Sequence, residues 1–158
     1  MTLFDINEFV GAGAISNNAA GFSRSLMGLM DYVDGSVGKV IRKASIDLYR
    51  DIVEQTPVDT GRAKANWALS TVEANPDIRD KDGYSANELA VIISGEISDF
   101  KFDITDGVVW ITNNLEYIEQ LEDGTSEQAP YGMVSVSLAR FEAHFNDALI
   151  GLKGLSKT

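Results

Sequence analysis

Cysteine is absent from this chain of 158 residues, and histidine occurs once. The lack of cysteine excludes disulfides, thiolate metal ligands and cysteine nucleophiles. No apolar run reaches the roughly 18 residues that a membrane helix needs. The N-terminal sequence MTLFDINEFV also lacks the basic stretch and apolar core of a secretion signal. We therefore expect a soluble protein of a reducing cytoplasm, without a membrane partner.

Basic residues are also scarce, because 13 Lys and Arg stand against 24 Asp and Glu and leave a formal net charge of −11. DNA carries about one negative charge per 1.7 Å of its axis, so an acidic protein gains no affinity from releasing DNA counterions. Tight DNA binding is therefore disfavoured, whereas a surface past which DNA slides is compatible with this charge. A role of the charge in solubility alone stays open as the plainer explanation.

Recognisable catalytic patterns are missing as well. The sequence contains no Gly-x-Ser-x-Gly elbow, no HExxH, no Walker motif and no dinucleotide-binding glycine pattern. The single histidine, His144, lies beside the apolar stripe of the last predicted helix, where a packed or surface role is the more common one. We expect no enzyme activity, no cofactor and no metal. A hydrolase that uses carboxylates alone is the remaining enzymatic alternative.

The length and the 44% apolar content favour one domain with a core of its own. A domain near this size buries about two-thirds of its unfolded surface. We place a single domain over residues 36–152 and a short tail over 153–158. Residues 1–35 form an N-terminal extension that contains a small, polar, glycine-rich linker at 11–21. Two readings of this extension stay open, a helix packed on its own core and an arm that orders only against a neighbouring copy.

Three segments show helical signals. The first begins at Ser36 and ends before Pro57, because the residue preceding a proline is pushed out of the α region. Ser85 and Glu88 form a capping-box pair that predicts a second helix, although the apolar cluster at 91–93 also suits a strand. Apolar residues at helical spacing predict a third, C-terminal helix. The stripes of the first and third helices are Val37, Val40, Ile41, Ala44, Leu48 and Ile52, and Met133, Leu138, Phe141, Phe145, Leu149 and Leu152.

Strand signals occupy the middle of the chain. Asp106-Gly107 is a preferred two-residue turn, so we predict a hairpin of residues 100–105 and 108–113 with Phe102 opposite Ile111. A further strand is predicted over residues 67–72. The expected fold class is α+β, with a small antiparallel sheet packed by a long helix in the N-terminal half and by the C-terminal helix.

Two loops have distinctive chemistry. Pro57-Val58-Asp59-Thr60-Gly61-Arg62 is a tight connection, and the Arg62 guanidinium beside it is suited to clamp a carboxylate or a carbonyl. Further along, acidic residues crowd one side of a short helical turn before Gly124. A solvated acidic face is a better explanation for them than a metal site, because no His or Asn completes a ligand set. These acids are Glu116, Glu119, Glu122 and Asp123.

Several motifs occur in one order and spacing over residues 37–145. They are Pro57-Val58-Asp59-Thr60-Gly61-Arg62, Ile111-Thr112-Asn113-Asn114 with Tyr117, Leu121-Glu122 with Gly124-Thr125-Ser126, and Gln128-Ala129-Pro130 with Gly132-Met133-Val134. The ordered set resembles the tail-component and head–tail joining proteins of tailed bacteriophages, which include neck and tail-completion proteins.

The resemblance implies a small α+β structural protein of the virion, assembled in the host cytoplasm without catalysis or cofactors. It implies a homo-oligomeric ring, hexameric or dodecameric, between the portal or connector and the tail-tube or terminator proteins, with double-stranded DNA passing through the lumen. An acidic protein-binding module or DNA mimic is the alternative. The residues that we expect to contact partners are Arg62, Tyr117, Glu119, Glu122, Asp123, Thr125, Ser126, Gln128, Pro130 and Tyr131.

Overall fold

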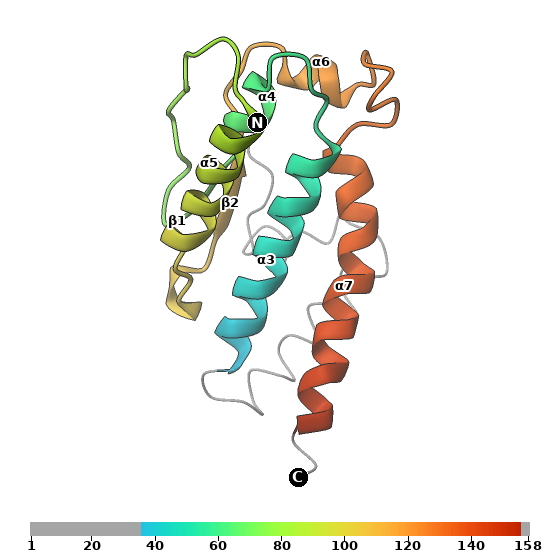
Figure 1. Ribbon diagram of the computed structural model, residues 1–158. Helices are drawn as coiled ribbons and strands as arrows, with labels where there is room; N and C mark the ends of the chain where they lie inside the picture. The colour runs from blue at the N-terminus through green and yellow to red at the C-terminus, as the bar shows by residue number, and fades with distance from the viewer. Residues whose placement is uncertain (1–35, 156–158) are drawn as a thin grey trace.

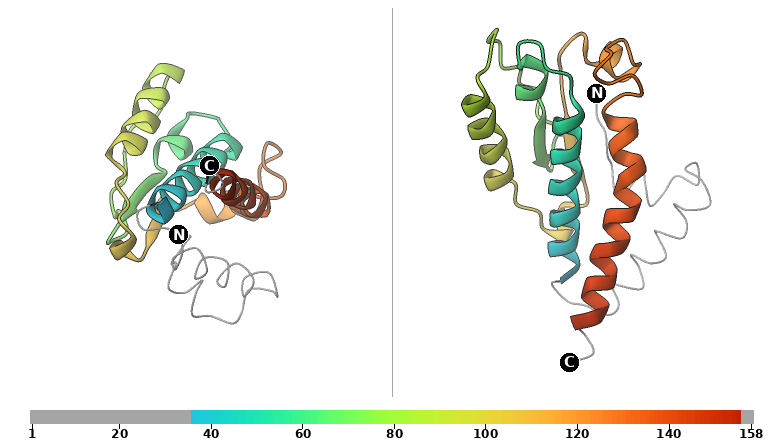
Figure 2. Two further views of the ribbon diagram at one scale, coloured as in Figure 1. Left: turned by 90° about the horizontal axis from the view of Figure 1, so that it is seen from below. Right: turned by 45° about the vertical axis from the view of Figure 1, so that its right-hand side comes forward.

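Two long helices, α3 (Ser36–Gln55) and α7 (Val134–Leu155), pack against each other along the domain in the computed structural model (Figure 1). The structure describes residues 36–155. On the other side of α3 lie a two-stranded sheet, β1 (Ala68–Thr71) and β2 (Val109–Thr112), and helix α5 (Ala86–Asp99) (Figure 2). Short helices α4 (Arg62–Ala65) and α6 (Ile118–Glu122) cover one end. The predicted α+β class with a small antiparallel sheet is confirmed.

Helix α3 is central, and the helix predicted from Ser36 is confirmed. Its predicted stripe is largely buried, but Ile46, Tyr49 and Val53 are buried too. The additional burial has a simple cause, since α7 packs against α3 from one side and the sheet lies on another. The Tyr49 hydroxyl marks the sheet side, where it donates a hydrogen bond to the Trp67 carbonyl at 3.2 Å.

Helix α5 confirms the capping-box prediction over the strand alternative. The Ser85 hydroxyl accepts a hydrogen bond from the Glu88 backbone N–H at 3.2 Å, and the Glu88 carboxylate accepts one from the Ser85 backbone N–H at 2.9 Å. These bonds satisfy donors that the first helical turn leaves free. At the other end, Arg42 Nε on α3 donates to the Phe100 carbonyl at 3.1 Å, and the Phe100 side chain is buried.

The predicted hairpin at Asp106-Gly107 is wrong. Residues Ile104–Asp106 form a 3-10 turn, η1, in which the Asp103 and Asp106 side chains accept hydrogen bonds from backbone N–H groups. Gly107 ends this turn with a φ of 73°. The partner of β2 is β1, in antiparallel register with Leu69 opposite Ile111. Local turn chemistry thus predicted the wrong partner for β2, because the strand that pairs with it lies in a distant segment of the sequence.

The strand predicted over residues 67–72 is confirmed as β1. The Trp67 side chain just before it is fully buried, and its Nε1 donates to Thr56 Oγ1 at 2.8 Å. That hydroxyl donates in turn to the Ile52 carbonyl at 2.7 Å. Burial of the indole is therefore accompanied by a partner for its only polar atom, as a buried tryptophan requires.

The predicted C-terminal helix is confirmed as α7, in which Phe141 and Phe145 pack with ring centroids 5.9 Å apart. The N-terminal extension, residues 1–35, lies outside the described part of the chain. So do the side chains of Val37, His144, Leu149 and Leu152. Among the described residues, no helix combines the length and the apolar character that crossing a membrane requires.

Candidate functional site

One end of the domain brings together two parts of the sequence that are far apart. We call it the α4–α6 end, and it comprises residues 57–65 and 113–132 (Figure 1). Between its two parts lies a pocket of about 240 Å³. Four of the predicted contact residues, Arg62, Tyr117, Ser126 and Gln128, line this pocket together with Asp59 and Thr60.

Gly61 gives the turn before α4 its shape. Its φ of 79° lies in the left-handed region, which L side chains rarely adopt. A Cβ on this residue would lie 3.2 Å from both Cβ and the carbonyl oxygen of Tyr84. The Tyr84 backbone N–H also donates to the Thr60 carbonyl at 2.7 Å. The glycine therefore lets the segment around Tyr84 pack tightly behind the pocket wall.

The Arg62 guanidinium forms ion pairs with carboxylates, as predicted, but these carboxylates belong to its own chain. Its Nη2 lies 2.7 Å from Asp80 Oδ1, and its Nη1 lies 3.7 Å from Asp82 Oδ1. Both aspartates are more than four-fifths exposed, whereas the arginine side chain is 26% exposed. Ion pairs with such exposed partners contribute only about 0–1 kcal/mol. The buried Nε of Arg62 has no hydrogen-bond partner among the described residues.

The loop that carries these aspartates is held in place by a network that the sequence did not reveal. Asn66 and the Arg79 backbone exchange hydrogen bonds of 2.7 and 3.1 Å, and Arg79 Nη1 donates to the Ala65 carbonyl at 2.8 Å. Arg79 also pairs with Glu96 on α5. Glu96 accepts a hydrogen bond from the Leu69 backbone N–H on the outer edge of β1 at 3.0 Å.

Tyr117 directly precedes α6 and is half-buried in the pocket wall. Burial raises the pKa of its hydroxyl; the positive charge of Arg62 opposes this effect, while Asp82 and Asp59 reinforce it. The phenol therefore stays protonated at neutral pH. It can donate one hydrogen bond and accept others within the pocket.

The two halves of the pocket are fastened to each other by side chains that bond to backbone. Gln128 Nε2 donates to the Val58 carbonyl at 3.1 Å, and its Oε1 accepts from the Val58 N–H at 2.9 Å, across 70 residues of sequence. The fully buried Asn113 donates to the Ala63 carbonyl at 2.9 Å. Pairing on both polar atoms of Val58 resembles a strand contact. It gives the pocket a defined shape before any partner binds.

Glu122 has an internal role that the sequence analysis missed. Its carboxylate accepts hydrogen bonds of 2.8–3.0 Å from the backbone N–H groups of Met133, Val134 and Ser135, and one from the Ser135 hydroxyl at 2.6 Å. These groups begin α7, where backbone donors lack helical partners and a negative charge is stabilising. A capping residue 12 positions before the helix it caps cannot be recognised from sequence spacing.

The loop between α6 and α7 is closely folded. Gly124 and Gly132 have φ angles of 82° and 76°. An added Cβ would lie 2.5 Å from the Pro130 carbonyl oxygen at Gly124 and from the Glu122 carbonyl oxygen at Gly132. Thr125 Oγ1 donates to the Gln120 carbonyl at 2.8 Å. Among the predicted contact residues, Thr125 and Gln128 thus hold the loop together as well.

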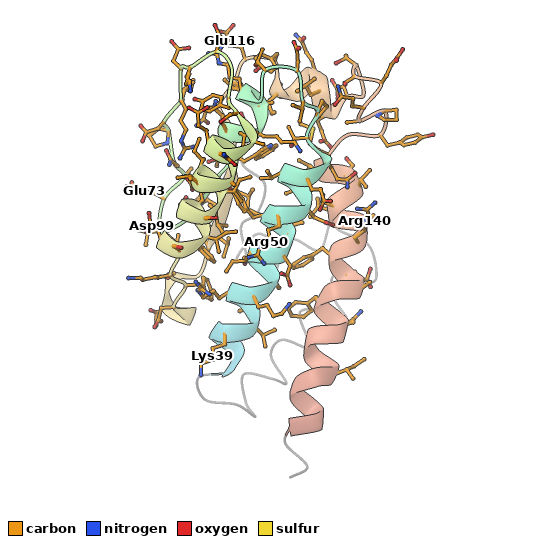
Figure 3. All side chains as sticks on the ribbon, viewed as in Figure 1. Lys39, Arg50, Glu73, Asp99, Glu116 and Arg140 are labelled. Carbon is orange, nitrogen blue, oxygen red and sulfur yellow. The ribbon has the colours of Figure 1, made fainter. Side chains whose placement is uncertain are left out.

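The other predicted contact residues point outward. Glu119, Asp123, Pro130 and Tyr131 are exposed, and Tyr131 is 81% exposed. Residues 113–132 contain no Lys or Arg, so this part of the α4–α6 end is strongly acidic. Figure 3 shows Glu116 at this end of the domain and Lys39 at the opposite end. Within the described part of the chain, no three His, Asp or Glu residues gather as metal ligands would.

The pocket therefore combines a guanidinium, a carboxylate and hydroxyls on a preformed frame, which is suited to binding a group with both polar and apolar parts. Comparisons with protein-family models, curated proteins and solved structures find no match to this chain.

Proposed function

We propose that this protein is a non-catalytic structural component of a tailed-bacteriophage virion, and that it forms a ring at the head–tail interface. One observation supports this proposal most. Motif residues that carry the family resemblance, from the turn at 57–62, from Tyr117 and from the loop at 124–128, converge on one pocket. Residues that serve one surface would be expected to gather in this way although they are far apart in sequence.

A ring is built from heterologous contacts, in which one surface of a subunit meets a different surface of the next. The α4–α6 end has two such surfaces, the recessed pocket and the exposed loop between α6 and α7. Both are held by internal hydrogen bonds, including those of Gln128 and Thr125. Binding surfaces that are already ordered lose less conformational entropy on association.

The acidic surface supports the proposed position at the head–tail interface, where DNA passes through the ring. The stretch without Lys or Arg, residues 113–132, would repel phosphates, so DNA could pass along it without binding tightly. The neighbours proposed along the ring axis are the portal or connector on one side and tail-tube or terminator proteins on the other. The location is then the virion, with assembly in the host cytoplasm.

Electron microscopy of the purified full-length protein at high concentration tests this function. We expect closed rings of uniform diameter. Images that show only particles of the size of one 17.2 kDa chain would contradict the proposal. A parallel titration against a basic, non-specific nuclease separates the DNA-mimic alternative, because a mimic would inhibit the nuclease at equimolar ratio and the proposed ring subunit would not.

A further inference from the structure

The pocket at the α4–α6 end has no assigned occupant. We infer that it receives the Tyr131 side chain of a second copy of this chain, in a head-to-tail contact. This inference rests on the proposed function, because it names the two surfaces that meet between neighbouring subunits.

The size of the pocket limits its occupant. Ligand sites for cofactors and drug-sized molecules span about 300–1,000 Å³, and this pocket of about 240 Å³ is smaller. A single large side chain is therefore a more fitting occupant than a whole ligand molecule.

The charges around the pocket limit the occupant further. Asp59 lines the pocket, and Asp80 and Asp82 pair with Arg62, so three carboxylates and one guanidinium lie in or beside the pocket. Another carboxylate would be repelled by this excess of negative charge. A lysine or arginine would have to enter beside the Arg62 guanidinium, which is itself positively charged. An uncharged side chain avoids both repulsions.

Tyr131 has these properties. It is the most exposed large hydrophobic side chain among the described residues. Its phenol oxygen can accept a hydrogen bond, and its ring suits the apolar portion of the wall formed by Pro57 and Leu121. Tyrosine is also enriched among the residues that dominate binding energy at protein interfaces.

The shape of the loop explains why the contact must come from another copy. Ser126 and Gln128 from the same loop line the chain's own pocket, whereas Tyr131 remains 81% exposed outside it. The loop is fixed by the close approaches at Gly124 and Gly132. It projects beside the start of α7, away from α4 (Figure 1). A rigid projection and a pocket on one subunit are the two halves of a heterologous contact.

Photochemical cross-linking in the full-length protein tests this contact. Tyr131 is replaced by benzoylphenylalanine, which keeps an aromatic ring, and this variant is mixed with isotope-labelled, unsubstituted chain. We expect cross-links from position 131 to labelled peptides that contain residues 57–63 or 117–128. The matched control carries the same group at Val72, which is 75% exposed away from the pocket, and should give no such product.

Tyr131→Ala should also weaken self-association at least tenfold, and Tyr131→Phe should weaken it less. Self-association that persists while cross-links map elsewhere would overturn this inference and leave the proposed ring standing. Cross-links from position 131 to position 131 of another copy would show a symmetric contact and would also overturn it. Absence of any self-association would contradict both the contact and the proposed ring.

Discussion

In the helical body, Tyr49, Ile52 and Trp67 are fully buried between α3 and its neighbours. At the α4–α6 end, by contrast, side chains such as Gln128 and Glu122 bond to distant backbone groups while much of the surface stays exposed. Apolar burial contributes stability roughly in proportion to the area removed from water. Hydrogen bonds within the protein replace hydrogen bonds to water, so their net contribution to stability is smaller, but they fix the geometry of the groups they join.

This difference predicts that stability and assembly depend on different residues within one small domain. Substitutions in the body should unfold the protein and abolish assembly only as a consequence. Substitutions of exposed groups at the α4–α6 end should change assembly while the free energy of unfolding stays nearly constant. The unfolding midpoint and the mass of the assembly, measured together, distinguish these two kinds of variant.

The largest effect is expected for Trp67→Ala. Replacing a buried tryptophan by alanine should lower the free energy of unfolding by about 3–5 kcal/mol, because the cavity would be only partly refilled. Urea unfolding followed by circular dichroism measures the change. Trp110→Ala is the matched control, since Trp110 is only half-buried and should cost clearly less. Equal losses for the two variants would contradict the assignment of the core.

Glu122→Ala should have the next largest effect. It removes the acceptor for three backbone N–H groups at the start of α7, and hydrogen bonds to a charged group contribute about 1.5–3 kcal/mol each. Water will replace part of this loss, so we expect a decrease of about 2 kcal/mol in the free energy of unfolding. The exposed Glu119→Ala is the control and should change it by less than about 0.5 kcal/mol. A similar result for both glutamates would exclude the capping role.

Tyr117→Ala tests the boundary between the two regions. We expect self-association to weaken at least tenfold, while the free energy of unfolding falls by about 1 kcal/mol. Its side chain lines the pocket but also packs partly against the core. Mass measurement and urea unfolding on the same preparation separate these roles. An unfolded monomer would place Tyr117 in the core and not at the interface.

The smallest effect concerns Glu88, whose carboxylate caps α5. The hydrogen bond from Lys81, followed by those from Ser85, lowers its pKa from 4.5 to about 2. A depressed folded-state pKa means that the contribution to stability is complete above pH 4.5 and is lost as the pH falls toward 2. Nuclear magnetic resonance titration of the carboxyl carbon should show this low midpoint. Lys81→Ala should move the midpoint upward, and an unchanged midpoint would exclude the Lys81 contact as the main cause.

Local signals in the sequence predicted the elements that depend on neighbours along the chain. The stop before Pro57 and the Ser85–Glu88 capping box correctly gave α3 and α5. The hairpin failed because Asp106-Gly107 can close a 3-10 turn as readily as a strand pair, and nothing local favoured β1 as the partner of β2.

Only part of the candidate site could be predicted from the sequence. Sequence order marked Arg62, Tyr117, Ser126 and Gln128 as contact residues, and the structure places all four around one pocket. The sequence could not show that the Glu122 carboxylate turns inward to cap α7. The ion pairs of Arg62 and the network around Arg79 likewise depend on a loop whose path no periodicity encodes.

The proposed ring requires the α4–α6 end to join copies of this chain. Light scattering of wild-type protein and of Tyr131→Ala over the same concentration series tests it most directly. We predict that the wild-type mass rises from 17.2 kDa to one discrete multiple, while the variant remains at 17.2 kDa with an unchanged unfolding midpoint. Identical masses for the two proteins at every concentration would contradict it.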